Sequence, residues 1–73
     1  MQTITFQLRE GEVFIPLISL LKAVNLVYSG SEAQDVVVDG LVKRNGAIEL
    51  RKRAKIMAGD VVEFQGYRII VES

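Results

Sequence analysis

The sequence predicts an α+β fold in which two helices pack on a small, mostly antiparallel sheet. Three observations predict it: an alternating apolar segment at the N-terminus, two segments with helical spacing and helix end signals, and short strand-like segments near the C-terminus that are separated by glycine turns. A strand, two helices and then short strands is the order expected of an α+β domain. Because the chain has 73 residues and no linker or repeat, we expect one domain spanning residues 1–73.

The first strand and the first helix are predicted from the spacing of apolar residues. From Thr3 to Leu8 the even positions are apolar and the odd positions are polar, which is the period of a half-buried strand. Pro16 fits the first turn of a helix, where its missing N–H costs nothing, and Asn25 is suited to the left-handed residue that ends it. The apolar stripe of this helix is expected to contain Leu17, Leu20, Leu21 and Val24.

The second helix is predicted from its end signals over Ser29–Asp39. A capping box opens it, in which the Ser29 hydroxyl accepts a backbone N–H and Glu32 reaches back to the N–H of the cap residue. Gly40 is suited to a left-handed stop. Residues 36–38 are three valines, which prefer strands, but the two end signals favour a helix. Its buried side is expected to contain Ala33, Val36, Val37 and the later Leu41.

The C-terminal half is predicted to form short strands. Asn45-Gly46 is the strongest hairpin signal in the sequence, and residues 58–60 form another turn. Two strands are expected at Val61–Gln65 and Tyr67–Glu72, separated by Gly66. Their expected core residues are Val62, Phe64, Tyr67, Ile69 and Val71.

Positive charge is concentrated in the basic stretch, Val42–Lys55, which has six basic residues and one acidic residue, Glu49, on a chain with no net charge. Such a patch on a neutral protein is expected of a surface that binds polyphosphate locally. The alternative is a solvated hairpin with cations on its outer face. We predict that the cations gather mainly on one exposed surface near the hairpin. They are Lys43, Arg44, Arg51, Lys52, Arg53 and Lys55.

Composition argues against several classes of function. The chain has no cysteine and no histidine, so disulfides, thiolate metal sites and the commonest general base and metal ligand are absent. The acids are scattered singly, and we expect no enzyme activity, cofactor or metal. The N-terminus has no signal-peptide pattern, and the apolar run Phe14–Leu21 is too short to span a membrane. We therefore expect a soluble cytoplasmic protein.

Four segments in order carry a resemblance to a known family. They are Leu20–Lys22, Ser29–Ala33, Asp39–Gly46 and Ala58–Val62. This set resembles the RNA-binding domain named after small-subunit ribosomal protein four, also called the alpha-L motif, over roughly residues 14–64. The segment Glu49–Ile56 and the short chain are similar to the free-standing bacterial members, in which the domain is nearly the whole protein.

The resemblance implies binding to structured RNA, typically ribosomal or transfer RNA, through the two helices and the loop into the hairpin. The chain departs from the family pattern at the start of the first helix, where it has Pro16, Ile18 and Ser19, and around the start of the second, where it has Gly30 and Gln34. It also has Arg44 where a buried valine is common. These departures move the expected contacts toward Lys43–Lys55. The residues expected to contact RNA are Lys43, Arg44, Asn45, Arg51, Lys52, Arg53 and Lys55, with Ser29, Ser31 and Gln34 at the second helix.

Two further observations bear on the ligand. No aromatic residue lies within the basic stretch, which favours recognition of RNA backbone and shape over stacking on unpaired bases, although duplex DNA is a similar polyanion. The alternative is a protein-interaction or homodimerising accessory module that uses apolar faces at Val38, Ile70 or Val27. The salt dependence of binding distinguishes these functions, because the affinity for polyphosphate falls steeply as salt rises, whereas an apolar interface barely responds to salt.

Overall fold

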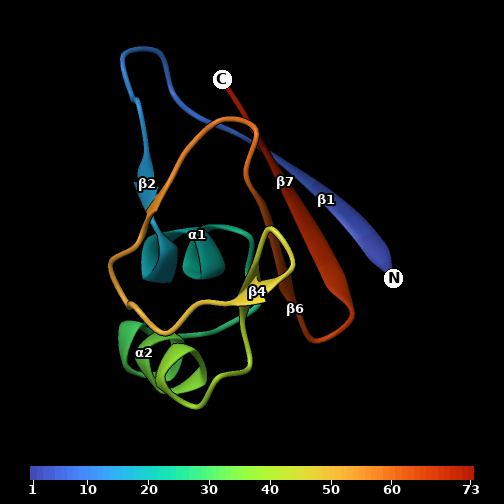
Figure 1. The fold of residues 1–73 in the computed structure, drawn as a ribbon. Coiled ribbons are helices and arrows are strands. Elements are labelled where there is room, and N and C mark those ends of the chain that lie inside the picture. The colour runs from blue at the N-terminus through green and yellow to red at the C-terminus, as the bar shows by residue number, and fades with distance from the viewer.

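The computed structural model describes residues 1–73 as two helices and two sheets (Figure 1). The elements are β1 (Gln2–Gln7), β2 (Ile15–Pro16), α1 (Leu17–Ala23), α2 (Gly30–Val38), β3 (Lys43–Arg44), β4 (Ala47–Ile48), β5 (Lys55–Ile56), β6 (Val61–Phe64) and β7 (Tyr67–Glu72). The main sheet has the order β1-β7-β6-β3-β4, and β2 pairs with β5 in a second, two-stranded sheet. The predicted α+β fold, with two helices and a mostly antiparallel sheet, is confirmed.

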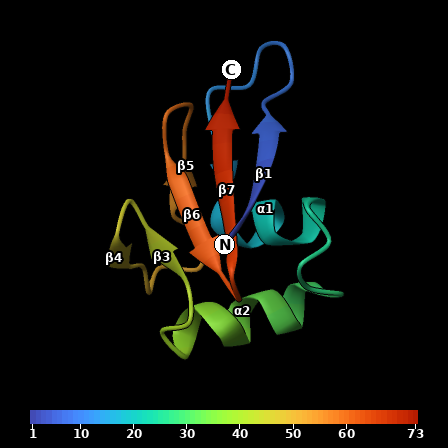
Figure 2. The ribbon, with the colours of Figure 1, turned by 90° about the vertical axis from the view of Figure 1, so that its right-hand side faces the viewer.

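The main sheet is mixed because β1 and β7 run parallel, side by side (Figure 2). Their register places Ile4 opposite Ile69 and Phe6 opposite Val71. Leu8 lies just beyond β1, where it is buried and its N–H donates to the carbonyl of Glu72 at 2.7 Å. The alternation predicted for residues 3–8 therefore matches a strand whose apolar face turns toward the core.

Both helices end in the left-handed turns that the sequence predicts. Asn25 has φ 62° and Gly40 has φ 75°. The N–H of Leu26 donates to the carbonyl of Leu21 at 3.1 Å, and the N–H of the residue after Gly40 donates back into α2 in the same way. These are Schellman motifs, which satisfy the last carbonyls of a helix.

The start of α2 differs in one contact from the predicted capping box. Ser29 is the N-cap, and its hydroxyl accepts the N–H of Glu32 at 3.1 Å. The Glu32 carboxylate reaches one residue further back than predicted and accepts the N–H of Tyr28 at 2.7 Å. The helix that the end signals predicted is thus present despite its three valines, because capping and burial outweigh their preference for strands.

The core fills the space between the helices and one face of the sheet (Figure 1). Its fully buried large side chains are Leu17, Leu20, Leu21, Ile56, Ile69, Val37, Val42, Val62 and Val71. One core prediction is wrong, because Leu41 is 55% exposed. Val36 is half-buried and packs against the core, and Tyr67 is half-buried. Leu41 is exposed because the chain has already turned away from the core at Gly40. No helix is long and apolar enough to cross a membrane.

Candidate nucleic-acid interface

The basic loop, residues 49–54, lies across the first turn of α1 and is bonded to it. The N–H of Leu17 donates to the carbonyl of Ala54 at 2.9 Å, and the N–H of Ile18 donates to the carbonyl of Lys52 at 3.2 Å. The first N–H groups of a helix have no partner within the helix. The loop carbonyls supply those partners, so the loop is held in a fixed position over the helices.

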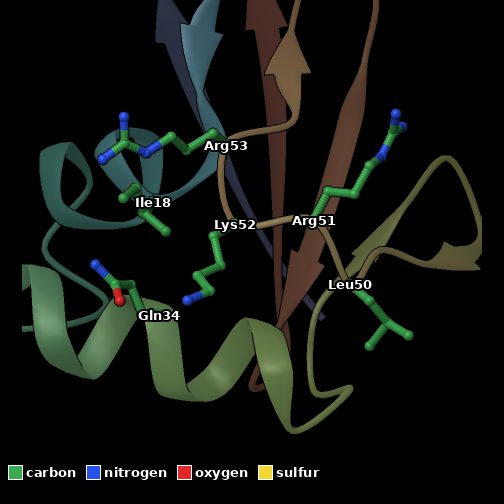
Figure 3. A pocket seen from close by; sticks show the side chains of 6 residues that line it. All are labelled: Ile18, Gln34, Leu50, Arg51, Lys52 and Arg53. Carbon is green, nitrogen blue, oxygen red and sulfur yellow. The ribbon is translucent and has the colours of Figure 1, made fainter.

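This arrangement forms a hollow of about 470 Å³, here called the basic hollow (Figure 3). Its lining residues are Ile18, Gln34, Leu50, Arg51, Lys52 and Arg53. Figure 3 shows the Lys52 side chain descending toward α2 and the Arg53 side chain extending over α1, whereas Arg51 extends from the opposite side of the loop. Neither Lys52 nor Arg53 forms a salt bridge with an acidic residue.

Arg51 differs from its two neighbours because it is paired with Glu49. Its Nε lies 3.1 Å from Glu49 Oε2, its Nη2 lies 3.3 Å from Oε1, and its backbone N–H also donates to Oε2. The hydrogen bond from the Arg51 side chain lowers the pKa of Glu49 against the opposing effect of burial. This pairing reduces the positive charge that Arg51 offers to a ligand.

Arg44 lies inside a polar network and is only 19% exposed. Its Nη2 donates to Asp60 Oδ2 and to the carbonyl of Lys55, both at 2.8 Å, and its Nη1 lies 3.6 Å from Glu49 Oε1. Burial would raise the pKa of Asp60, but hydrogen bonds from the Met57 N–H and from the Asn45 and Arg44 side chains outweigh it and lower that pKa. Arg44 therefore ties the hairpin to the turn before β6.

Asn45 also serves the fold. Its backbone N–H donates to the carbonyl of Val61 and its Oδ1 accepts the N–H of Val61, both at 2.8 Å. Its Nδ2 donates to Asp60 Oδ1 at 3.0 Å. Asn45 thus continues the pairing of β3 with β6 around the hairpin turn, with φ 52°.

The remaining cations of the basic stretch lie apart from the hollow. Lys43 lines a separate, smaller depression with Leu41 and Glu63, and the Lys55 ammonium lies 5.1 Å from the centroid of the Phe14 ring. The prediction that the six cations gather mainly on one exposed surface near the hairpin is therefore wrong. Arg51, Lys52, Arg53 and Gln34 all line the basic hollow, although the Arg51 side chain extends from the opposite side of the loop, and Lys43, Arg44 and Lys55 lie apart from it.

The family follows from comparison with known proteins. Residues 6–72 match the model of the S4 domain family. The chain belongs to the S4 domain family. It is 42% identical over 57 residues to "Putative RNA-binding protein YbcJ" of Escherichia coli (strain K12), which covers 78% of this chain and 81% of the relative. It has the same identity and coverage with "Uncharacterized protein YbcJ" of Shigella flexneri.

A solved structure gives the same result for the fold. The solution structure of E. coli YbcJ, described as revealing an αL motif involved in RNA binding, matches with a TM-score of 0.75 and 37% sequence identity, over 100% of this chain and 91% of that one. The resemblance drawn from the four ordered segments is thereby confirmed.

In this S4 domain the outer face of α2 carries acids and no cation. Glu32, Asp35 and Asp39 are exposed there, and no basic residue lies between Gly30 and Asp39. A polyanion would be repelled by that face, whereas Lys52 and Arg53 at the basic hollow have no acidic partner. Of the other residues expected at α2, Gln34 lines the hollow, Ser29 caps the helix and Ser31 is exposed.

Two lining residues, Ile18 and Leu50, were not predicted as site residues. Both side chains are apolar, so a pattern of charge does not reveal them. The one signal for them in the sequence is position. Leu50 immediately precedes the three consecutive cations at residues 51–53, and Ile18 falls outside the apolar stripe of α1, so its side chain points to the basic hollow and away from the stripe.

Proposed function

We propose that this S4 domain binds structured RNA, of the ribosomal or transfer kind, through the basic hollow. The observation that carries the proposal is the placement of Lys52 and Arg53: both lack an acidic partner, and both lie on a loop that two backbone hydrogen bonds hold against α1. A loop held in one position loses little backbone conformational entropy when its cations bind phosphates. The printed names of E. coli YbcJ and of its structure support the same ligand.

The other expected contacts are assigned by their geometry. Arg51 contacts phosphate while it remains paired with Glu49, and the exposed Ser31 hydroxyl offers a donor near the start of α2. Lys43 and Lys55 are exposed beyond the hollow and reach RNA that extends past it. Arg44 and Asn45 position the hairpin and are not proposed to contact RNA directly. In this proposal the protein is a non-catalytic cytoplasmic binder.

A salt titration against one RNA hairpin tests the proposal. Each phosphate contact contributes about −0.9 to the slope of log affinity against log salt, as measured on DNA duplexes. The double variant Lys52→Ala/Arg53→Ala is therefore expected to flatten the slope by about two units and to weaken binding to all sequences alike. The matched control is Arg9→Ala/Lys22→Ala, which removes the same charge from exposed positions outside the hollow.

Equal affinities and equal slopes for the wild type and the Lys52/Arg53 variant would contradict the proposal. Because both side chains are exposed and unpaired, the variant is expected to fold, and circular dichroism of the two double variants checks this. Loss of binding in the control alone would place the RNA on another surface.

An exposed apolar cluster supports a second candidate function, a protein-interaction or homodimerising module. Val38, Leu41, Ile48 and Leu50 are each 55% to 58% exposed. Ile48 and Leu50 both lie beside Gly40, because a methyl group placed on Gly40 would lie 3.8 Å from Ile48 Cγ2 and 3.9 Å from Leu50 Cδ2. Of the residues predicted for this function, Val38 is exposed, Ile70 is half-buried and Val27 is buried. Self-association that persists at high salt, measured by sedimentation, would support this module.

A further inference from the structure

We infer that the basic hollow takes one unpaired RNA nucleotide, with its base against Ile18, its base edge bonded to the Gln34 amide, and its phosphate beside Lys52 and Arg53. The inference rests on the proposed function and names the class of RNA that the site prefers. That class is RNA with a bulged or looped-out nucleotide, in preference to a continuous duplex.

The size and lining of the hollow fit a nucleotide better than a phosphate alone. Its volume of about 470 Å³ lies within the range of about 300–1,000 Å³ that is typical of small-ligand sites. Two of its six lining residues are apolar, Ile18 and Leu50. A phosphate needs neither this room nor an apolar wall, whereas a base uses both.

The Gln34 amide is free to make the contact. Gln34 is half-buried in the middle of α2, and its side chain takes part in none of the side-chain hydrogen bonds of the structure. Figure 3 shows it rising from α2 into the space below Ile18 and beside Lys52. An amide presents one donor group and one acceptor side by side, the arrangement that pairs with the N6 and N7 atoms of adenine.

The walls of the hollow are fixed before a ligand arrives. Ile18 is bonded through its N–H to the carbonyl of Lys52, and α2 is capped at Ser29 and stopped at Gly40. Little ordering of the protein is therefore needed on binding, which favours affinity.

A base enters such a hollow only when it is unpaired. In an RNA duplex the base is stacked between its neighbours, and its N6 and N7 atoms lie in a deep, narrow major groove that side chains cannot read, so sequence-specific RNA recognition acts on loops, bulges and ends. The absence of aromatic residues among the cations favours recognition of RNA backbone and shape. The hollow instead offers apolar contact from Ile18 and a polar edge contact from Gln34.

The test compares two RNA hairpins that differ by a single bulged adenosine in an otherwise continuous stem. Wild-type protein is expected to bind the bulged hairpin about 5- to 150-fold more tightly, the range for one bidentate amide–base contact. Gln34→Ala is expected to lose this preference and to bind the two hairpins with equal affinity. Gln2→Ala, which removes an exposed amide from the far edge of the sheet, is the matched control and should behave as wild type.

Direct observation of the amide completes the test. In ¹⁵N-labelled protein, the side-chain NH₂ signals of Gln34 are expected to shift when the bulged hairpin is added and not when the continuous hairpin is added, while those of Gln2 stay in place. Equal binding of both hairpins by the wild type, or an unchanged preference in Gln34→Ala, would overturn the inference and leave RNA binding intact. Failure to bind either hairpin at 50 mM salt would instead remove the proposed function itself.

Discussion

Single residues in the basic stretch have different tasks, and Arg44 shows this most clearly. Its guanidinium bonds Asp60, which lies 16 residues further along the chain, and a backbone carbonyl 11 residues away. Arg53, nine positions later in the same stretch, is exposed and has no acidic partner. The same residue type thus stabilises the hairpin at one position and is available to a ligand at the other.

We expect Arg44→Ala to lower the free energy of unfolding by about 2 kcal/mol, because it removes charged hydrogen bonds from a site with little solvent. Arg53→Ala is expected to change it by less than about 0.5 kcal/mol, as is usual for exposed surface positions. Urea denaturation of the two variants measures the difference. If both variants were as stable as wild type, Arg44 would be a solvated cation and the network would contribute nothing to stability.

The partner of Arg44 could not be predicted from the sequence, for a physical reason. A local charge count treats all six cations alike, whereas the pairing of Arg44 with Asp60 exists only after β3 has paired with β6. Helix ends are different, because the signals at Ser29, Asn25 and Gly40 act on neighbouring backbone groups. Those ends were predicted correctly, and the grouping of the cations was not.

At the scale of elements, α2 holds its position through its two ends. Ser29 satisfies an N–H at the start, and the left-handed Gly40 closes the end. Both are needed because α2 supplies Ala33 and Val37 to the core and, from the adjacent side of the helix, Gln34 to the basic hollow. A shift at either end of this short helix would move the core contacts and the hollow together.

Gly30 at the start of α2 and Gly40 just after its end make a matched pair of variants. Gly40→Ala is expected to lower the free energy of unfolding by about 1–2 kcal/mol, because its φ of +75° is costly for a residue with a Cβ, although the new methyl group would make only ordinary van der Waals contacts. Gly30→Ala is expected to raise it by about 0.5 kcal/mol, because Gly30 begins the helix without a positive φ and has nothing within 4 Å of a new methyl group. Thermal or urea unfolding measures both. Equal destabilisation by the two substitutions would show that backbone conformation at residue 40 does not limit α2.

At the scale of the whole molecule, acidic and basic residues lie on different surfaces, and some of them form ion pairs. The acids Glu32, Asp35 and Asp39 line the outer face of α2, while Lys52 and Arg53 lie at the hollow beside it. The total charge is zero, so attraction of RNA depends on this arrangement. The sequence predicted that acidic and basic residues are separated, but it placed the positive surface at the hairpin. In the structure the basic loop, which is bonded to α1, brings the cations to the helices instead.

Glu49 and Asp60 are each bonded to basic or amide groups, and this predicts that low pH destabilises the fold. Hydrogen bonds lower the pKa of both carboxyls below the ordinary values of 4.5 and 3.8, so the folded state binds protons less readily than the unfolded chain. Stability from these groups is therefore complete above about pH 5 and is lost as the pH falls through the ordinary values toward the lowered ones. Urea unfolding at pH 7, 5, 4 and 3 should show this loss.

Asp60→Asn serves as the control for that prediction, since it removes one of the two titrating groups and should make the decline below pH 5 shallower. A decline of the same size in wild type and Asp60→Asn would assign acid sensitivity to other carboxyls.

The parallel pairing of β1 with β7 sets the order in which the protein can be completed during synthesis. β7 lies between β1 and β6 in the sheet, yet it is the last strand to be made, so β1 has no sheet to join until residues 67–72 have been added. Contacts between residues far apart in sequence form slowly. During synthesis we therefore expect β1 to lack its partner strand, and Ile4 and Phe6 to lack their places opposite Ile69 and Val71, until almost the whole domain has been made.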